Sequence, residues 1–388
     1  MTVTSKFFVH ALPSENVQKN HLVGIDLLRF FAAFSVMAFH MAFWSWAPNI
    51  STPRSISGGV FRYPEVSALS ASGWVGVEIF FVISGFVIVY SANGTAWQFL
   101  TSRILRLVPS VWICAPITTA LLSLLTQYSD SDILRRLIRS LTFWPFPQWV
   151  DGVYWTLGIE IAFYSVIFIL LVTRLKSFIV PFLVTLGGAS TVFWLVQITS
   201  PFPLSRELEL TLLPHGCFFA IGGLLWAILI NRASNWLWIF VALSVLGGVI
   251  EIAHIAIPRA QLAGTSSTVY LAIGIWIAGI VSIYLSIRYA GRMASLFPSG
   301  FARILGLTTY PLYLIHQTMG AGILKSSAVL GLNRWSALCL AMLLPILVSL
   351  VIVKYIERPI QNACSTAIDS KFSAWLRRIV DFRWPEKT

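Results

Sequence analysis

Ten long apolar segments constrain the fold of this chain more than any other feature of its sequence. Each has roughly 18 to 25 residues, the length that a helix needs to cross a hydrocarbon core about 30 Å thick. The segments lie near residues 25–47, 73–91, 108–127, 154–173, 178–198, 212–230, 236–256, 267–287, 303–325 and 335–356. A shorter apolar tract near 141–150 contains Pro145 and Pro147, so we interpret it as a loop.

The composition supports a membrane protein. Hydrophobic residues make up 57% of the chain and charged residues 11%, whereas soluble domains carry about 25% charged residues. We therefore predict an all-α polytopic membrane protein with about ten transmembrane helices in a lipid bilayer. The net charge of +12 would suggest nucleic acid as the partner of a soluble protein. Because basic residues of membrane proteins collect in cytoplasmic loops, we expect no nucleic-acid partner here.

The distribution of basic residues predicts the orientation. Ten spans place both termini on one side, and this side carries roughly twice as many Lys and Arg residues, which indicates the cytoplasm. We expect a cytoplasmic tail over residues 1–23, a transmembrane domain over 24–357 and a cytoplasmic basic tail over 358–388. The basic segment 131–143, SDILRRLIRSLTF, falls in an outer loop against this rule. It is either an amphipathic helix on the membrane surface or a sign that one span is miscounted.

The first span carries an arginine and a histidine in an otherwise apolar run, GIDLLRFFAAFSVMAFH. Arg29 and His40 are eleven residues apart, so on a helix their directions differ by only ~20° and their positions by ~16 Å along the axis. Ionisable residues inside a membrane face the protein interior or a water-filled cavity. We therefore expect Arg29, near the cytoplasmic end, and His40, beyond the midplane, to open onto one common hollow.

Four titratable side chains from four spans lie at similar depth. Counting residues from the outer end of each span gives roughly 8 to 13 Å. These residues are His40, Glu78, Glu160 and His316. Their convergence is inferred from depth alone, because the sequence does not define helix rotation. A buried histidine can also be only an interhelical hydrogen bonder, and either glutamate can pair with an arginine or a tyrosine to hold helices together.

Two arginines follow the second span. Arg103 and Arg106 are spaced i, i+3 in RILR, so both can share one face of a helical turn at the cytoplasmic interface, near the level of Arg29. Three guanidinium groups at one level can form a phosphate site, because the planar fork binds oxygens in pairs. Alternatively, Arg103 and Arg106 only reach lipid headgroups, and Arg29 orders the first helix by pairing with Asp26.

Other polar residues of the spans are interpreted as structural. Glu251 and His254 lie near the outer end of the seventh span and are expected to reach the membrane interface, whereas His215 begins the sixth span. The cysteines are far apart and predict neither a disulfide framework nor a zinc site, so we expect no metal. They are Cys114, Cys217, Cys339 and Cys364.

Several sequence blocks follow one another in a characteristic order. IDLLRFFAAFSVMAFH has an arginine, ten residues and a histidine, GVEIFFVISGFVI follows, and RILR is an R-x-x-R element. WTLGIEIAFYS contains Trp155, Glu160 and Tyr164, and TYPLYLIHQ and ERP come near the end. Together they resemble the acyltransferase-3 family of bacterial integral membrane acyltransferases over most of residues 24–360. Leu27 stands where many members carry glycine, and no periplasmic esterase-like domain is appended, so the chain resembles the stand-alone form.

The resemblance implies transfer of an acyl group, usually acetyl, from a cytoplasmic acyl-CoA to a hydroxyl group, usually of a cell-envelope or exported glycan. It implies a multi-pass enzyme of the bacterial cytoplasmic (inner) membrane, with acetyl-CoA or another acyl-CoA as co-substrate and no tightly bound cofactor. It also implies that the matching Arg29, His40, Arg103 and Arg106 are functional.

A mechanism can be written with these residues. Arg103 and Arg106 would bind phosphates of the acyl-CoA donor. His40 would act as general base on the acceptor hydroxyl, contributing ~10²–10⁴-fold, and Glu160 would set its basicity. Direct attack and an acyl-histidine intermediate both stay open. Other residues expected to line the site are Asp26, Glu78, Trp155, Tyr164, Tyr310 and His316.

Two other classes of function stay open at the level of sequence. A secondary transporter or exporter with a buried His/Glu proton relay would also have ten helices, although it does not explain an arginine cluster at one face. A scaffold in glycan assembly would use the same polar groups structurally. The sequence does not determine the acceptor, the length of the acyl group or the oligomeric state.

Overall fold

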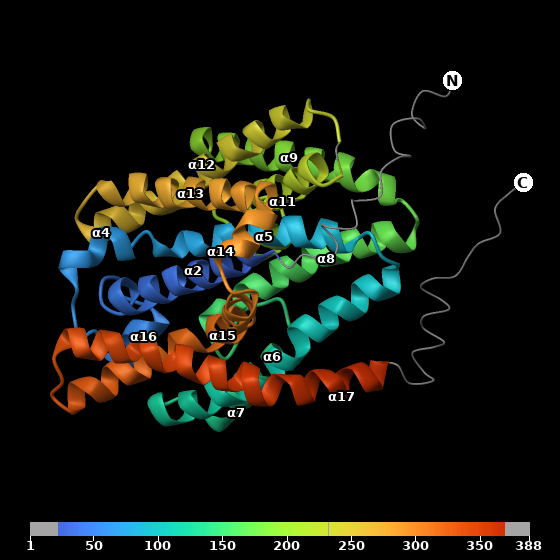
Figure 1. Cartoon of the computed structure of the whole chain (residues 1–388). Coiled ribbons are helices and arrows are strands. Elements are labelled where there is room, and N and C mark those ends of the chain that lie inside the picture. The colour runs from blue at the N-terminus through green and yellow to red at the C-terminus, as the bar shows by residue number, and fades with distance from the viewer. Residues whose placement is uncertain (1–21, 232, 369–388) are drawn as a thin grey trace, which may run out of the picture.

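The computed structural model describes residues 22–231 and 233–368, and every regular element in these ranges is helical (Figure 1). The long helices are α2 (Val23–Phe39), α5 (Gly76–Ser91), α6 (Ala96–Leu125), α8 (Trp155–Val172), α9 (Ile179–Thr199), α11 (Gly216–Leu229), α12 (Leu237–Ala263), α13 (Ser267–Arg288), α15 (Ser299–Val329) and α16 (Arg334–Val351). The shorter helices are α3 (Thr52–Ser57), α4 (Ser67–Ser70), α7 (Asp130–Leu141), α10 (Arg206–Leu210), α14 (Ala290–Leu296) and α17 (Arg358–Ile368).

All ten apolar segments of the sequence are helical. Within the described residues, eight helical segments are long and apolar enough to cross a membrane. The two expected spans outside this group are α11, which has 14 residues, and α15, which has 31 residues and contains polar side chains at 308–309 and 316–318. The prediction of an all-α polytopic membrane protein is therefore confirmed, with eight candidate spans.

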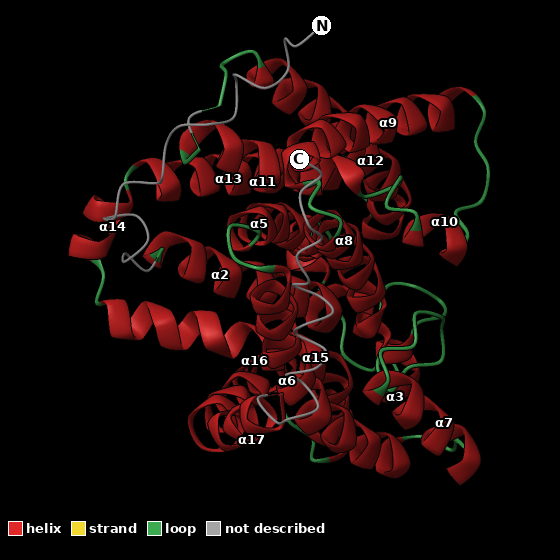
Figure 2. Ribbon diagram, turned by 90° about the vertical axis from the view of Figure 1, so that its right-hand side faces the viewer, coloured by secondary structure: helices red, strands yellow, loops and turns green. Residues whose placement is uncertain are grey.

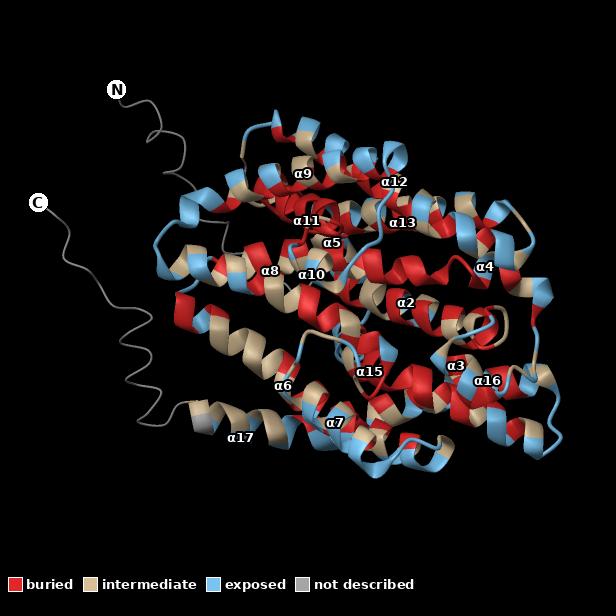
Figure 3. Ribbon diagram, turned by 180° about the vertical axis from the view of Figure 1, so that it is seen from behind, coloured by how far each residue is buried: buried red, intermediate tan, exposed pale blue. Residues whose placement is uncertain are grey.

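The long helices lie side by side in a bundle. Viewed along the bundle, α5 and α8 lie near the centre, with α9, α11, α12 and α13 on one side and α6, α15 and α16 on the other (Figure 2). Helix α11 packs on α5, α9 and α12, and its residues from Gly216 to Ile228 are all buried (Figure 3). A helix enclosed by protein needs no polar face, which explains why α11 is apolar all round.

Glycines let α5 and α11 approach closely at the centre of the bundle. A Cβ atom at Gly222 would collide with the carbonyl oxygen of Val82, and one at Gly85 would collide with the carbonyl oxygen of Phe219. Small residues at helix interfaces in membranes allow such close backbone contact. The contact fixes the position of α5 against its neighbours, and α5 contributes side chains to two of the three cavities described below.

Helix α6 begins at Ala96, well before the expected start near residue 108. The Thr95 hydroxyl accepts a hydrogen bond from the Gln98 amide, and the Gln98 side chain accepts one from the Thr95 amide. This capping box starts the helix at a defined residue. Arg103 and Arg106, which were expected on one helical turn, therefore lie within α6 itself. The expected boundary was wrong because the first turns of α6 are polar and do not stand out by hydropathy.

The basic segment 131–143 forms the amphipathic helix α7, which packs on α6. With 12 residues it is too short to cross a membrane. Arg136 donates to the carbonyl oxygen of Trp149 at 3.0 Å, and Arg139 donates to the carbonyl oxygen of Pro147 at 2.6 Å. Residues 142–150 contain no helix, so the loop prediction there is confirmed. The arginines of α7 thus hold this loop in place.

The residue Glu251 does not reach the membrane interface, so this expectation is wrong. Its side chain is fully buried, with Oε1 at 2.9 Å from Nδ1 of His215 and Oε2 at 3.7 Å from the thiol of Cys217. Helix α12 continues to Ala263, beyond the expected end near residue 256, which places Glu251 deeper in the bundle. His254 is exposed, and its ring lies 5.4 Å from that of Trp194.

The predicted tails lie largely outside the described residues, which exclude 1–21 and 369–388. The beginning of the predicted C-terminal tail, however, is the helix α17. It follows α16 through a π-helical turn, η6 (Ile352–Glu357), and packs against α6. This part of the chain therefore belongs to the folded bundle.

The close contact between α5 and α11 predicts a sharp stability effect. Gly222→Ala should lower the free energy of unfolding by ~1–3 kcal/mol or more, because the added methyl group meets backbone atoms that cannot rotate away. The matched control is Gly188→Ala in α9, where a Cβ meets nothing within 4 Å. The apparent Tm of both variants in detergent tests this. Equal Tm values for the two variants would contradict the proposed close packing.

Candidate active site

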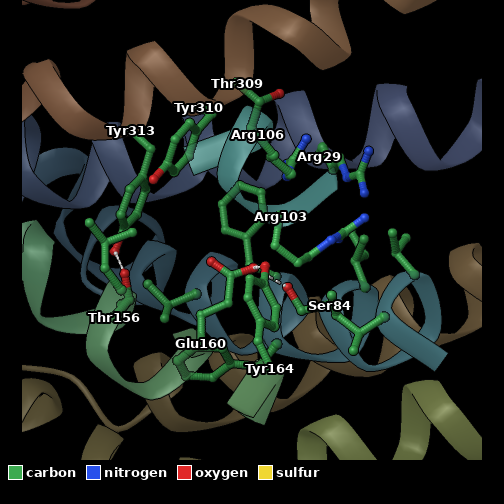
Figure 4. A pocket seen from close by; sticks show the side chains of 17 residues that line it. Arg29, Ser84, Arg103, Arg106, Thr156, Glu160, Tyr164, Thr309, Tyr310 and Tyr313 are labelled. Atoms are coloured by element: carbon green, nitrogen blue, oxygen red, sulfur yellow. Dashed lines mark hydrogen bonds between the residues drawn. The ribbon is translucent and has the colours of Figure 1, made fainter. Parts of the chain in front are cut away.

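A small cavity lined by three arginines lies among α2, α5, α6, α8 and α15, and we call it the arginine cavity. Its volume is about 60 Å³. Its polar lining residues are Arg29, Ser84, Arg103, Arg106, Thr156, Glu160, Tyr164, Thr309, Tyr310 and Tyr313 (Figure 4). The remaining lining residues are aliphatic and aromatic, so the charged groups lie in a largely apolar wall.

The three arginines turn their guanidinium groups toward the same part of the arginine cavity (Figure 4). The guanidinium of Arg103 lies 5.7 Å from the ring centre of Tyr164, and that of Arg106 lies 5.8 Å from the ring centre of Tyr310, which are cation–π distances. Among the described residues, neither Arg103 nor Arg106 forms an ion pair, whereas Arg29 does. Nε of Arg103 donates to the hydroxyl of Ser102 at 3.2 Å, and no carboxylate of the described residues competes for the other donors, which can contact an anion in the cavity.

Two carboxylates flank the arginines. Asp26 accepts a hydrogen bond from Arg29 at 3.2 Å, which is the i−3 pair that the sequence suggested. Glu160 accepts hydrogen bonds from the hydroxyl of Ser84 at 2.8 Å and from the hydroxyl of Tyr164 (Figure 4). Both hydroxyls donate to Oε1 of the half-buried Glu160 carboxylate, and the bond from Tyr164 orients the ring on which Arg103 lies.

A second, larger cavity of about 360 Å³ is lined by His40, and we call it the histidine cavity. Its wall comes from the end of α2, the start of α3, the starts of α5 and α8 with the turns before them, the last turns of α12 and the middle of α15. His40 begins a five-residue π-helical turn, η1 (His40–Trp44). Such turns are rare and occur frequently at functional sites. The other polar lining residues are Ser51, Thr52, Glu78, Arg259, Tyr313 and Gln317.

The residue His316 defines the hydrogen-bonding state of His40. Nδ1 of His40 lies 2.9 Å from Nε2 of His316, and Nδ1 of His316 lies 2.9 Å from the carbonyl oxygen of Tyr313. Because a carbonyl oxygen only accepts, Nδ1 of His316 carries the proton, and Nε2 of a neutral His316 is an acceptor. Nδ1 of His40 then donates, which leaves the lone pair of Nε2 on the neutral His40 ring available as a base.

The expectation of one common hollow for Arg29 and His40 is wrong. Arg29 lines the arginine cavity and His40 lines the histidine cavity. Val77 and Tyr313 line both cavities and form the partition between them. The hydroxyl of Tyr313 lies 3.2 Å from that of Thr156, which holds the tyrosine across the boundary. The helical spacing was correct, but these two side chains fill the space between the residues.

The expected pair between Glu160 and His40 is also not formed. Glu160 lines the arginine cavity, where Ser84 and Tyr164 donate to it, while the hydrogen-bond partner of His40 is His316. Both residues were placed at similar depth from the sequence. The rotation of α8, which depth does not define, turns Glu160 toward the arginines.

A third cavity of about 380 Å³ adjoins the arginine cavity on the side of α17, and we call it the α17 cavity. Arg106 and Tyr310 line both cavities. The other polar lining residues of the α17 cavity are Ser102, Glu357, Gln361, Asn362 and Ser365. The three cavities therefore adjoin in series through the bundle, with the narrow arginine cavity in the middle.

The remaining predicted residues can be placed in this series. Glu78 and Trp155 line the histidine cavity, and Tyr164 and Tyr310 line the arginine cavity. His316 does not itself line the histidine cavity but contacts His40, which does. Among the described residues, no group of three or more His, Cys, Asp or Glu could hold a metal ion.

Sequence reasoning missed Arg259, a charged residue of the histidine cavity. Its guanidinium lies 4.7 Å from the ring centre of Trp74, 5.5 Å from that of Trp44 and 5.8 Å from that of Phe39. In the sequence it follows Pro258, beyond the expected end of the seventh span, and was counted as a loop residue. Its apolar surroundings in IAIPRAQLA were the one signal that it lies on a helix.

Comparison with known proteins identifies the family. The model of a family described as an acyltransferase domain matches residues 22–354. The chain is 28% identical to nodulation protein 10 of Rhizobium leguminosarum bv. viciae over 175 residues, which are 39% of this chain and only 45% of that protein. It is 26% identical to the exopolysaccharide production protein ExoZ of Rhizobium meliloti (strain 1021) over 315 residues, 74% of this chain and 89% of that protein.

No solved structure matches the chain. The family match, in contrast, covers the bundle from the start of α2 to η6. It includes His40 and the three arginines that line the arginine cavity. The chain therefore belongs to the acyltransferase-3 family of membrane acyltransferases.

Proposed function

We propose that the protein is an O-acetyltransferase that moves the acetyl group of cytoplasmic acetyl-CoA to a hydroxyl group of a cell-envelope or exported glycan. The observation that carries this proposal is the series of cavities, in which three arginines and a histidine with a free lone pair lie on opposite sides of Tyr313. The family supports acyl transfer, and the relative named for exopolysaccharide production supports a glycan acceptor.

The donor would enter from the side of α17. Amide side chains of Gln361 and Asn362 in the α17 cavity can hydrogen-bond a nucleotide, and this cavity is wide enough for a bulky group. Arg103 and Arg106, which have no ion-pair partner among the described residues, would bind the phosphates in pairs of hydrogen bonds. The arginine cavity is narrow and suits the slender pantetheine arm, whose thioester would end near Tyr313.

The acceptor would enter the histidine cavity from the other side. Nε2 of His40 removes the proton of the acceptor hydroxyl while its oxygen attacks the thioester carbonyl carbon. The C–S bond then breaks, the ester forms, and the CoA sulfur leaves as a thiol after taking the proton from the imidazolium. We propose this direct attack because His40 lines the cavity that the acceptor would enter, where its Nε2 can take the hydroxyl proton.

This mechanism requires a defined orientation in the membrane. All ten long helices would cross the bacterial inner membrane, with the predicted tails 1–23 and 358–388 in the cytoplasm and the transmembrane domain 24–357 between them. Acetyl-CoA is the co-substrate, and no tightly bound cofactor takes part. The transporter alternative has less support, because it gives no role to the three arginines that line the arginine cavity.

Replacement of His40 tests the base. His40→Ala should lower the rate of acetyl transfer by ~10²–10⁴-fold, because no other group takes the hydroxyl proton. The Kd for acetyl-CoA should change less than twofold. The matched control is His254→Ala, which removes an exposed histidine. Transfer of labelled acetyl groups to glycan in inside-out vesicles measures the effect, and full activity of His40→Ala would exclude the base role.

Replacement of the unpaired arginines tests the donor site. Each charge-assisted hydrogen bond to phosphate contributes ~1.5–3 kcal/mol, so Arg103→Ala or Arg106→Ala should raise the Kd for acetyl-CoA about tenfold or more. The control is Arg303→Ala, which removes an exposed arginine of α15. Calorimetric titration of protein in nanodiscs gives the affinities. An unchanged Kd for acetyl-CoA in both variants would show that Arg103 and Arg106 do not bind the donor, and would favour the alternative that they contact lipid headgroups.

The hydrogen bond that His40 donates to His316 predicts a positioning effect. His316→Leu removes the acceptor for Nδ1 of His40, so kcat should fall at least about tenfold while the Kd for acetyl-CoA stays constant, and the pH profile of kcat should shift. His316→Gln keeps an acceptor and should recover part of the activity. Equal activity of the Leu and Gln variants would show that the hydrogen bond does not matter.

A further inference from the structure

The histidine cavity contains polar groups that the proposed acid–base chemistry does not use. Trp74 Nε1, Glu78 Oε2 and Arg259 Nε are buried and have no hydrogen-bond partner among the described residues. All three residues line this cavity. An unpaired buried polar group is costly, so three of them around one cavity indicate a place where a ligand supplies the missing partners.

The carboxylate of Glu78 and the guanidinium of Arg259 form no ion pair with each other among the described residues, although both line the same cavity. Glu78 is 2% exposed. Arg259 is held by Trp74, on whose ring it lies, and by the carbonyl oxygen of Ile255, to which Nη1 donates at 2.7 Å. Arg259 is thus held by other groups than Glu78, and both side chains line a cavity of about 360 Å³ that has room for a group contacting both.

We propose that Glu78 and Arg259 form the acceptor subsite and that it binds the neutral ring of a sugar. This inference rests on the proposed function, since it names the substrate class received beside His40. A sugar hydroxyl can donate to Glu78 while a neighbouring hydroxyl accepts from Arg259. The indole N–H of Trp74 supplies a further donor, and the aromatic rings of Trp44 and Trp155 in the wall suit the apolar face of the ring.

The pair of opposite charges also selects against charged acceptors. A carboxylate on the sugar would be attracted by Arg259 but repelled by Glu78. An ammonium group would be attracted by Glu78 but repelled by Arg259. Like charges in a cavity of low polarity are strongly unfavourable. A neutral ring with several hydroxyl groups satisfies both residues without such a cost.

The experiment measures glycoside binding without acetyl-CoA, by saturation-transfer difference NMR on the full-length protein in nanodiscs. The probes are methyl β-D-glucopyranoside, its glucuronide as the anionic match and its glucosaminide as the cationic match. We expect saturable binding of the neutral glycoside and at least tenfold weaker binding of both charged ones. Glu78→Gln and Arg259→Lys should each weaken neutral binding at least tenfold, while the Kd for acetyl-CoA stays within twofold.

The control variant is Arg292→Lys, which changes an exposed arginine of α14 and should leave glycoside binding unaltered. The inference is overturned if the wild type binds no glycoside, if a charged glycoside binds as well as the neutral one, or if both variants bind it normally. A parallel change in the Kd for acetyl-CoA would also overturn it, by showing a general structural role. Failure of the proposed function would look different: glycoside binding would persist without any acetyl transfer.

Discussion

The free-energy cost of burying charge in an apolar bundle governs this structure. Arg29, Arg103, Arg106 and Arg259 are too expensive to face lipid, and each instead contacts a carboxylate or an aromatic ring beside a cavity. Their helices must therefore rotate toward the bundle interior. The cavities follow from this requirement, because solvated or ligand-bound charges do not allow the close packing found between α5 and α11.

Tyr313, which lies between the arginine and histidine cavities, separates the proposed donor site from the proposed acceptor site. Under the proposed function, donor and acceptor approach from opposite sides of the membrane and need to meet only at the thioester and the hydroxyl. A tyrosine held by Thr156 lies between the arginine and histidine cavities and lines both. The same helix, α15, carries Tyr313 and His316 one turn apart, which couples the partition to the hydrogen bond that orients His40.

The sequence analysis was most accurate where one local rule decides the result. Hydropathy found all ten long helices, prolines identified the loop near 145, and the i−3 spacing predicted the pair between Arg29 and Asp26. It failed where packing decides. The start of α6 was missed because polar side chains interrupt the apolar pattern of its first turns, and Arg259 was missed because its partners Trp44 and Trp74 come from distant segments.

The sequence alone determined that the chain is an all-helical membrane protein and which charged residues must avoid lipid, because hydropathy and the cost of burying charge are properties of single segments. It also predicted that Arg29, in α2, and His40, directly after it, point in similar directions, because helix geometry relates residues along one helix. Only the tertiary structure decided that Glu160 faces the arginines, that His316 partners His40 and that Tyr313 divides the hollow. These relations depend on the rotation and contact of separate helices, which arise from packing among residues far apart in the chain.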